Sequence, residues 1–141
     1  MRSGTWERDL AAYIDSVRDA AFEYGVHDCL IFANDAHRAV TGRGFADDVV
    51  ARAKTARAAH RAYLTALRAI SGEDGADLLD ERLERCAGVP FRGDIVARRV
   101  PKNTTGYALG VVVGNSVAFI GADDGLTFLT YEPTDLAWMT I

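Results

Sequence analysis

The hydrophobic pattern of the chain changes once, at Gly88, and this change limits the folds that the sequence can adopt. Before Gly88, apolar residues recur at spacings of three and four, which is the period of amphipathic helices. After Gly88, short apolar and β-branched runs alternate with turn residues, as in consecutive strands that are joined by hairpins. Helices followed by an antiparallel sheet make an α+β architecture, in which the apolar faces of the two layers pack together. The sequence therefore predicts N-terminal helices packed on a C-terminal antiparallel sheet.

The part before Gly88 contains four segments of helical character. The first has its apolar stripe at Trp6, Leu10 and Ile14, and the third is rich in alanine, the best helix former. We expect one or two helices in the third segment and one in each of the others: residues 5–19, 28–41, 46–70 and 76–85.

The second helical segment carries a cysteine at its start. Asp28 is a suitable N-cap residue, so Cys29 would be the first residue of the helix, and Gly42 would end it as a C′ glycine. At that position the thiol faces unpaired backbone N–H groups and the positive end of the helix dipole, which favour the thiolate. Reactive cysteines use this arrangement. A cysteine that only packs in the core fits the same spacing, because free cysteine is among the most buried residue types.

The part after Gly88 consists of short strands with turns between them. Gly114-Asn115 is a two-residue hairpin connection, and Asp123-Asp124-Gly125 is a second hairpin turn. The nearly continuous apolar run at residues 109–113 predicts a central strand. We expect a sheet of four or five antiparallel strands, drawn from residues 95–100, 109–113, 116–120, 126–131 and 136–141.

The composition excludes several classes of protein. The 141 residues, 49% hydrophobic and 26% charged, are typical of one soluble globular domain, which we place at residues 1–141. The net charge of −4, with basic and acidic residues interleaved, argues against a nucleic-acid partner, and no apolar run reaches the ~18 residues of a membrane span. Cys29 and Cys86 form neither a disulfide framework nor a zinc spacing, and Asp123 and Asp124 fit a turn better than a metal site. We therefore expect no cofactor and no metal.

Three short segments, in their order along the chain, resemble the motifs of one enzyme family. They are Phe22-x-Tyr24-Gly25 followed by Asp28-Cys29, then Arg92-Gly93-Asp94-Ile95-Val96, then Leu109-Gly110-Val111-Val112-Val113-Gly114. This order is similar to that of the NlpC-type papain-like cell-wall cysteine peptidases, whose Asp-Cys nucleophile motif precedes a Gly-Asp-aliphatic strand and a strand with the catalytic histidine. The resemblance covers the whole chain and implies a papain-like fold. More narrowly, the chain resembles small phage and gene-transfer-agent proteins of this lineage that are encoded among tail genes.

The resemblance implies roles for the residues around the start of the second helix. Cys29 would occupy the nucleophile position, beside a binding surface formed by Phe22, Tyr24, His27, Asp28 and Tyr107. The family's histidine falls at Ala108 in this sequence, and without an imidazole nothing takes the thiol proton or protonates the leaving amine. This departure implies a pseudoenzyme in which hydrolysis has been lost.

Three hypotheses on function remain open. The first is a structural component of a phage-like tail tip or hub, which acts in tail assembly, host attachment or genome delivery. Its partners would be other tail-tip or hub proteins and, secondarily, host peptidoglycan; it would be made in the bacterial cytoplasm and reside in the tail of the virion or particle. The second is an active endopeptidase that cleaves peptidoglycan with Cys29 and a base from elsewhere. The third is a generic α+β binding domain, for which the resemblance would be accidental.

The last twelve residues are rich in large apolar side chains. Aromatic residues and methionine are enriched at the centres of interfaces, so we expect a contact surface for tail partners at Tyr131, Leu136, Trp138 and Met139. Alternatively, these side chains cover the sheet of their own domain, as terminal strands commonly do.

Overall fold

The helices and strands follow one another in the order that the sequence predicts. The computed structural model describes residues 1–55, 76–101, 106–121 and 125–141. The helices are α1 (Trp6–Val17), α2 (Cys29–Thr41), α3 (Asp47–Thr55) and α5 (Asp77–Arg82). The strands are β1 (Glu84–Arg85), β2 (Ile95–Arg99), β3 (Tyr107–Val112), β4 (Val117–Ile120), β5 (Leu126–Leu129) and β6 (Leu136–Met139). The predicted α+β class is confirmed, whereas the expected helix over residues 56–70 and the turn at residues 123–124 lie outside the described residues.

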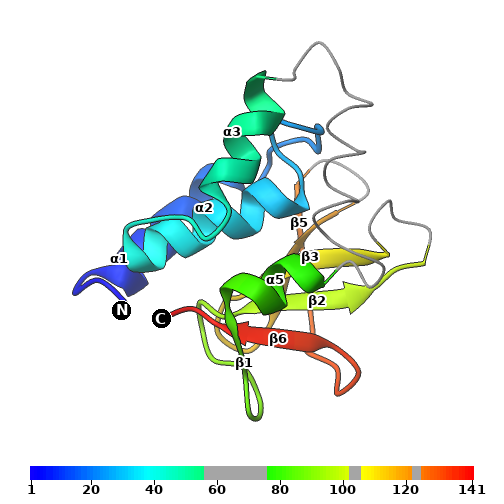
Figure 1. The fold of residues 1–141 in the computed structure, drawn as a ribbon. Coiled ribbons are helices and arrows are strands. Elements are labelled where there is room, and N and C mark those ends of the chain that lie inside the picture. Colours follow the sequence, from blue (N-terminus) through cyan, green and yellow to red (C-terminus); the bar gives the residue numbers. More distant parts are fainter. Residues whose placement is uncertain (56–75, 102–105, 122–124) are drawn as a thin grey trace.

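The strands form one antiparallel sheet in the order β1-β6-β2-β3-β4-β5 (Figure 1). The strands β2 to β5 are the predicted succession of hairpins, and β3 lies inside the sheet as expected. The prediction of four or five strands is wrong, because β1 adds a sixth that pairs with β6. The helix expected over residues 76–85 ends at Arg82 for the same reason. The strand β1 consists of two exposed charged residues and lacks the alternation of apolar and polar residues that predicts a strand. It is recognised only by its pairing with β6.

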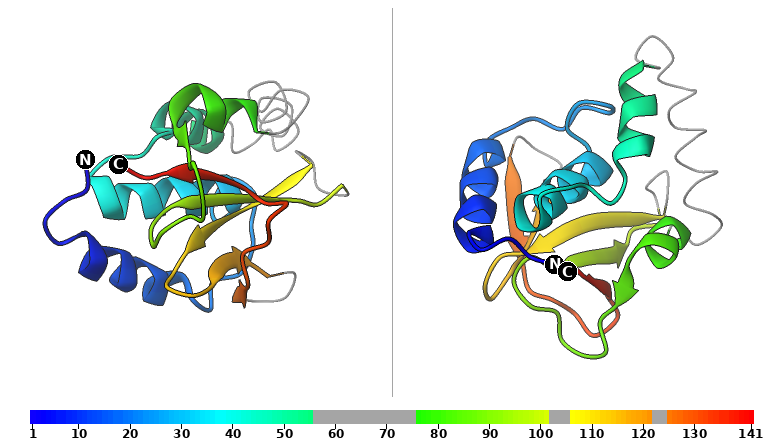
Figure 2. Two further views of the ribbon diagram at one scale, coloured as in Figure 1. Left: turned by 90° about the horizontal axis from the view of Figure 1, so that it is seen from below. Right: turned by 60° about the vertical axis from the view of Figure 1, so that its left-hand side comes forward.

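The central helix α2 begins and ends where the sequence predicts. The Asp28 carboxylate accepts a hydrogen bond from the backbone N–H of Ile31 at 2.9 Å, and Gly42 has a left-handed φ of 89°. Figures 1 and 2 show α1, α2 and α3 together on one side of the sheet. The helix α2 packs against both α1 and β3. Its polar residues Asn34 and His37 are buried as well, and they contact the segment of residues 43–47 that follows the helix.

The stripe predicted for α1 lies in the core. Leu10 and Ile14 are buried, and the ring of Tyr13 stacks on that of Phe32 with the centroids 6.0 Å apart. The cluster that joins the two helices to the sheet comprises Leu10, Ile14, Phe32, Ala36, Val40, Val111 and Ala118. This packing holds α1 beside the hairpin of β3 and β4.

Successive residues of β3 point to opposite faces of the sheet. Tyr107, Leu109 and Val111 lie on the face that carries the helices. The other face carries a separate cluster of Val96, Ala108, Val112, Val117, Phe119 and Ala137. Gly110 belongs to this second face, and a Cβ there would lie 2.7 Å from the Phe119 ring. The close approach of this ring requires a glycine in β3.

The C-terminal strand β6 lies between β1 and β2, not at an edge. The Trp138 side chain has no exposed surface, packs in the core with Ile95 and Leu79, and donates from Nε1 to Asp80 at 3.0 Å. This position agrees with the alternative in which the segment covers the sheet of its own domain. Tyr131, Leu136 and Met139 are each half-buried, and an interface formed by them stays a prediction.

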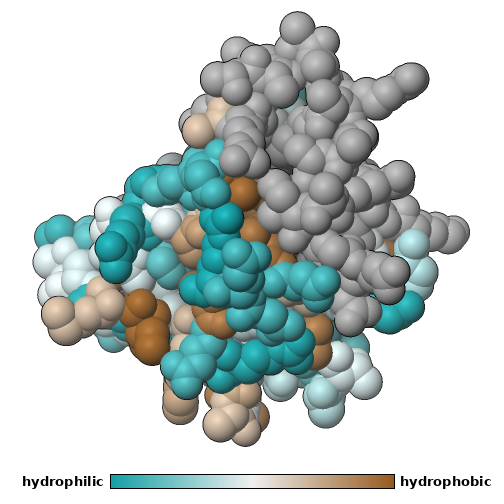
Figure 3. Space-filling model, in the orientation of Figure 1, coloured by the Kyte–Doolittle hydropathy of each residue, from teal (hydrophilic) through white to brown (hydrophobic). Residues whose placement is uncertain are grey.

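The surface seen in Figure 3 is mainly hydrophilic, with hydrophobic residues in small separate patches. Among the described helices, none combines the length and the apolar character that a bilayer crossing demands.

Asp94 is a buried carboxylate that joins three distant segments. Its Oδ1 accepts hydrogen bonds from the Arg2 guanidinium at 2.9 Å and from the backbone N–H of Thr140 at 3.1 Å. Its Oδ2 accepts the backbone N–H of Phe91 at 2.8 Å. Arg2 in turn donates to the carbonyl oxygens of Thr140 and Arg92, at 2.8 and 2.7 Å. One carboxylate thus fixes the N-terminal segment, the turn before β2 and the end of β6.

We predict that Asp94→Ala lowers the free energy of unfolding by about 3–5 kcal/mol, because the substitution leaves a partly buried guanidinium without its partner. Chemical denaturation with constant m-value measures the loss. The control is Asp15→Ala, which removes an exposed ion pair with Arg18 and should cost about 0–1 kcal/mol. Equal losses in the two variants would contradict the linking role of Asp94.

A second prediction concerns β6. Deleting residues 136–141 removes the strand that joins β1 to β2, together with the buried Trp138. Removal of such a tryptophan side chain alone costs about 3–5 kcal/mol, a large part of the roughly 5–15 kcal/mol that stabilises a domain. We expect the deletion to abolish the cooperative thermal transition seen by circular dichroism. Deleting the exposed Ile141 alone should preserve it, and a cooperative transition in the longer deletion would show that β6 is dispensable.

Candidate functional site

The site begins at Asp28, which fixes both the loop before α2 and the first turn of the helix. Its Oδ2 accepts the backbone N–H of Gly25 at 3.0 Å, while its Oδ1 accepts that of Ile31 at 2.9 Å. The side chain is buried, so both hydrogen bonds are shielded from water. Cys29 is therefore the first residue of α2, as the sequence predicts, and its position is defined by the cap.

Cys29 is partly exposed and packs against the sheet, and its surroundings favour the protonated thiol. The residue contacts the core cluster that contains Leu30, Ala33 and Leu109. Burial raises the pKa of Cys29 to about 11, the Asp28 carboxylate acts in the same direction, and backbone hydrogen bonds, above all with Leu109, lower it only in part. Of the two alternatives that the spacing leaves open, this environment agrees with the cysteine that packs in the core, because desolvation of the sulfur outweighs the helix dipole.

Ala108 does not face Cys29. It packs against the cluster on the sheet face opposite to the helices, whereas Tyr107 and Cys29 pack against one cluster on the helix face. The expectation that Ala108 occupies the place of a base beside the thiol is therefore corrected by the alternation of β3. The side chains that β3 turns toward α2 near this point are a tyrosine and a leucine. Neither serves as a base at neutral pH.

His27 is the histidine nearest to Cys29 in the sequence, and the structure does not pair the two. The His27 ring is buried and meets Phe32 edge-on with the centroids 6.1 Å apart. Burial lowers the pKa of His27, although the carboxylates of Asp28 and Asp35 act in the opposite direction. Within the described part of the chain, its Nε2 has no hydrogen-bond partner, and no histidine is among the groups that shift the pKa of Cys29.

The loop before Asp28 divides the predicted binding residues into two groups. Glu23 and His27 exchange backbone hydrogen bonds of 2.9 and 2.8 Å, which close a tight turn. Phe22 and Tyr24 project from this turn, remain exposed and contact each other edge-to-face with the centroids 4.6 Å apart. Asp28 and His27 are buried. The loop before the cysteine helix therefore exposes two aromatic side chains, whereas His27 and Asp28 lie inside.

The remaining histidine and cysteine of the described residues serve packing. His37 Nδ1 lies 2.7 Å from the Arg43 carbonyl oxygen, and burial lowers the pKa of His37. Cys86 Sγ donates to Asp94 at 3.6 Å, and burial raises its pKa to about 11. In the four described stretches, no group of three or more His, Cys, Asp or Glu residues is placed to hold a metal ion.

One feature of the structure is not indicated by the sequence, in which the apolar stripe of α1 predicts only an amphipathic helix. A groove lies beside that stripe and is bordered by Glu7, Ala11 and Arg18 of α1. These residues are exposed neighbours of the buried Leu10 and Ile14. The groove depends on where the β3–β4 hairpin lies beside α1, and the sequence of the helix does not contain this information.

We predict that Cys29 is slow to alkylate. A thiol with a pKa of about 11 is ionised to roughly one part in a thousand at pH 8, and the thiolate is the reacting form. The rate of reaction with iodoacetamide, followed at Cys29 by peptide mass spectrometry, should rise about tenfold per pH unit from pH 7 to pH 10. The unfolded chain in denaturant is the control and should react as an ordinary cysteine. A rate that levels off near pH 7 in the folded protein would mean an activated thiol.

Comparison with known proteins places the chain in a family. No curated protein matches it, and no solved structure matches it. A family model described as a domain of unknown function, DUF6950, matches residues 1–140. Because the match covers nearly all 141 residues, the family assignment applies to the helices, the sheet and the cysteine site together. The chain is a member of the DUF6950 family.

Proposed function

We propose that this protein is a structural, non-hydrolytic component of a phage-like or gene-transfer-agent tail tip or hub, built on a degenerate NlpC-type papain-like fold. The observation that carries the loss of hydrolysis is the state of Cys29. Its thiol is held protonated by burial, and no histidine of the described residues acts on it. A cysteine nucleophile requires an adjacent base or a lowered pKa, and here neither condition is met.

The tail location is supported by the sequence. The order of the motifs at Asp28-Cys29, at Arg92-Gly93-Asp94 and at residues 109–114 resembles that of small tail-encoded proteins of the NlpC lineage. In the structure these motifs carry structural roles: Asp28 caps α2, and Asp94 joins three segments. Retention of the motifs for stability is consistent with a protein kept for its shape. Its partners are other tail-tip or hub proteins, and its mature site is the particle tail.

The exposed aromatic pair Phe22 and Tyr24 supports a role in contact with another molecule. The pair lies on the loop that leads into α2, and a further apolar side chain, Val26, is exposed beside it. Aromatic side chains are enriched at the centres of protein interfaces. In an active relative this surface would border the substrate, whereas here we assign it to a protein partner.

The alternative function is an active endopeptidase that cleaves peptidoglycan with Cys29. One observation favours it: Cys29 keeps the first position of a capped helix, where the helix dipole assists a nucleophile. This function requires a partner subunit or a rearrangement to bring a base to the sulfur and to lower the pKa of the thiol.

The two functions make opposite predictions for purified protein and isolated sacculi. We expect no release of new amino termini above the buffer control, because the protonated thiol has no base. Release that disappears in Cys29→Ala would establish the endopeptidase. A variant that retains a small side chain at position 29, Cys29→Ser, should also give normal numbers of particles in the producing host. Loss of particles in this variant, with its thermal transition unchanged, would contradict the structural role.

A further inference from the structure

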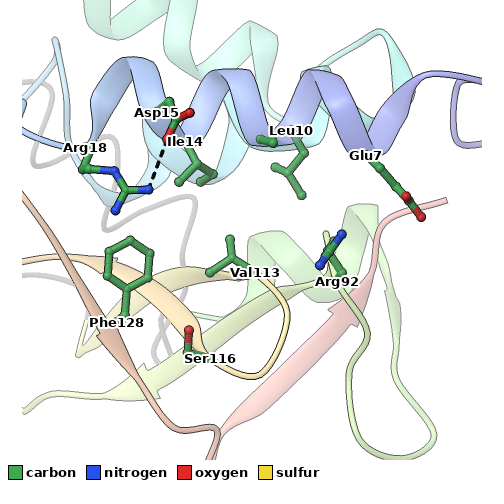
Figure 4. A pocket seen from close by; sticks show the side chains of 10 residues that line it. Glu7, Leu10, Ile14, Asp15, Arg18, Arg92, Val113, Ser116 and Phe128 are labelled. Atoms are coloured by element: carbon green, nitrogen blue, oxygen red, sulfur yellow. Dashed lines mark hydrogen bonds and ion pairs between the residues drawn. The ribbon is translucent and has the colours of Figure 1, made fainter.

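A groove runs along one side of α1, away from Cys29. It lies between the helix and the hairpin of β3 and β4, and it encloses about 280 Å³. Figure 4 shows Leu10 and Ile14 pointing from α1 into this space, and Val113 pointing toward them from the hairpin. The middle of the groove is therefore apolar. Leu10 and Ile14 are almost fully buried beneath it, and the apolar side chains that remain accessible are those of Ala11, Val113 and Phe128. The Ser116 hydroxyl also points into the groove and adds one polar group that can bind a peptide backbone.

The two ends of the groove carry different charges. At one end, Arg18 is already paired with Asp15 at 3.1 Å and lies over the ring of Phe128, 5.4 Å from its centroid. At the other end stand Arg92 and Glu7 (Figure 4). Among the described residues, neither of these two side chains has an ion-pair partner within 4 Å. The available cation of the groove is the Arg92 guanidinium.

The Arg92 guanidinium lies at this end of the groove and is exposed. A Cβ on Gly114 would lie 3.7 Å from its Nη2, so the side chain extends over the hairpin turn. The backbone carbonyl of Arg92 accepts a hydrogen bond from Arg2 at 2.7 Å, which fixes the residue at its base. An arginine with a fixed backbone and free guanidinium is suited to bind a carboxylate in a bidentate manner.

The dimensions fit an extended peptide better than a compact ligand. Glu7 and Arg18 border opposite ends, and they are separated by about 16 Å along a helix that rises about 1.5 Å per residue. An extended chain of about five residues, at about 3.3 Å each, covers that length. The enclosed volume lies below the roughly 300–1,000 Å³ of ordinary small-molecule pockets, although the groove is long.

We propose that this groove binds a short extended segment of a partner protein that presents apolar side chains to Ala11, Val113 and Phe128 and an acidic side chain to Arg92. This binding surface rests on the proposed role of the chain as an interaction protein of the tail. The apolar contacts supply affinity, and the carboxylate on Arg92 fixes the direction of the segment along α1.

The test is selection of random linear peptides from a display library on the purified, immobilised chain. We expect enrichment of peptides with an acidic residue next to aliphatic or aromatic ones. The selected peptides are then synthesised, and their affinities for the original chain and for three variants are measured by fluorescence anisotropy. Arg92→Glu should weaken binding at least about tenfold and, in a fresh selection, should shift the preference to basic peptides. Ala11→Phe fills the groove from its exposed rim and should abolish binding.

The matched control is Arg43→Glu, the same charge change at an exposed arginine outside the groove, which should leave the affinity unchanged. The thermal transition of each variant establishes that it is folded. The proposal is overturned if no peptide is enriched, or if the selected peptides bind Arg92→Glu and Ala11→Phe as tightly as the original chain. It is also overturned if sedimentation shows a dimer that Ala11→Phe dissolves, since a second copy then occupies the groove. The selection uses no particle, so its failure leaves the tail role to be judged by particle yield.

Discussion

The structure depends on the burial of one charge, the Asp94 carboxylate, and on the arginine that neutralises it. An isolated buried carboxylate is costly, so the fold is consistent only when Arg2 reaches it from the other end of the chain. The same arginine lies over the Trp6 ring, 4.2 Å from its centroid, which ties the start of α1 to this point. A second ion pair, Arg98 with Asp135, is bidentate, with hydrogen bonds of 3.0 and 2.7 Å, and joins β2 to the turn before β6. Both pairs connect residues that are far apart in the sequence, and both fix where β6 enters and leaves the sheet.

The chemistry of the cysteine site is decided by the balance between burial and the helix dipole. A helix N-terminus stabilises a negative charge by about 0.3–1 kcal/mol. The rise in the pKa of Cys29 from 9.0 to about 11 corresponds to a penalty of about 3 kcal/mol on the thiolate. Desolvation by the packing of α2 on β3 is therefore the larger effect. The helix start that would favour a nucleophile is thus opposed by the packing of Cys29 on the core cluster beside Leu109.

The sequence predicted what local interactions determine, and it failed where distant segments decide. Asp28 and Gly42 end α2 through their own side chain and backbone, and the turn at Gly114-Asn115 closes through Val113 N–H and the Ser116 carbonyl at 2.8 Å. In contrast, β1 exists through its pairing with β6, and its two residues have no strand pattern of their own. The face on which Ala108 lies is set by the pairing of Arg98 with Ala108 in β2 and β3, which no short motif specifies. The groove likewise arises from two elements that meet only in the folded chain.

The position of β6 has a consequence for the order in which the molecule is built. Strands β2 to β5 are formed by neighbours in the sequence and can pair through short loops, which close quickly. One edge of β2 stays open until β6 is available, because β6 is the last strand in the sequence and supplies the partners of Ile95, Val96 and Ala97. During synthesis this edge is an unsatisfied row of backbone groups in an apolar strand, the kind of surface on which chains associate wrongly. The docking of β6 thus closes the open edge of β2. The rate of this docking determines how long a nascent chain can associate wrongly with other chains through that edge.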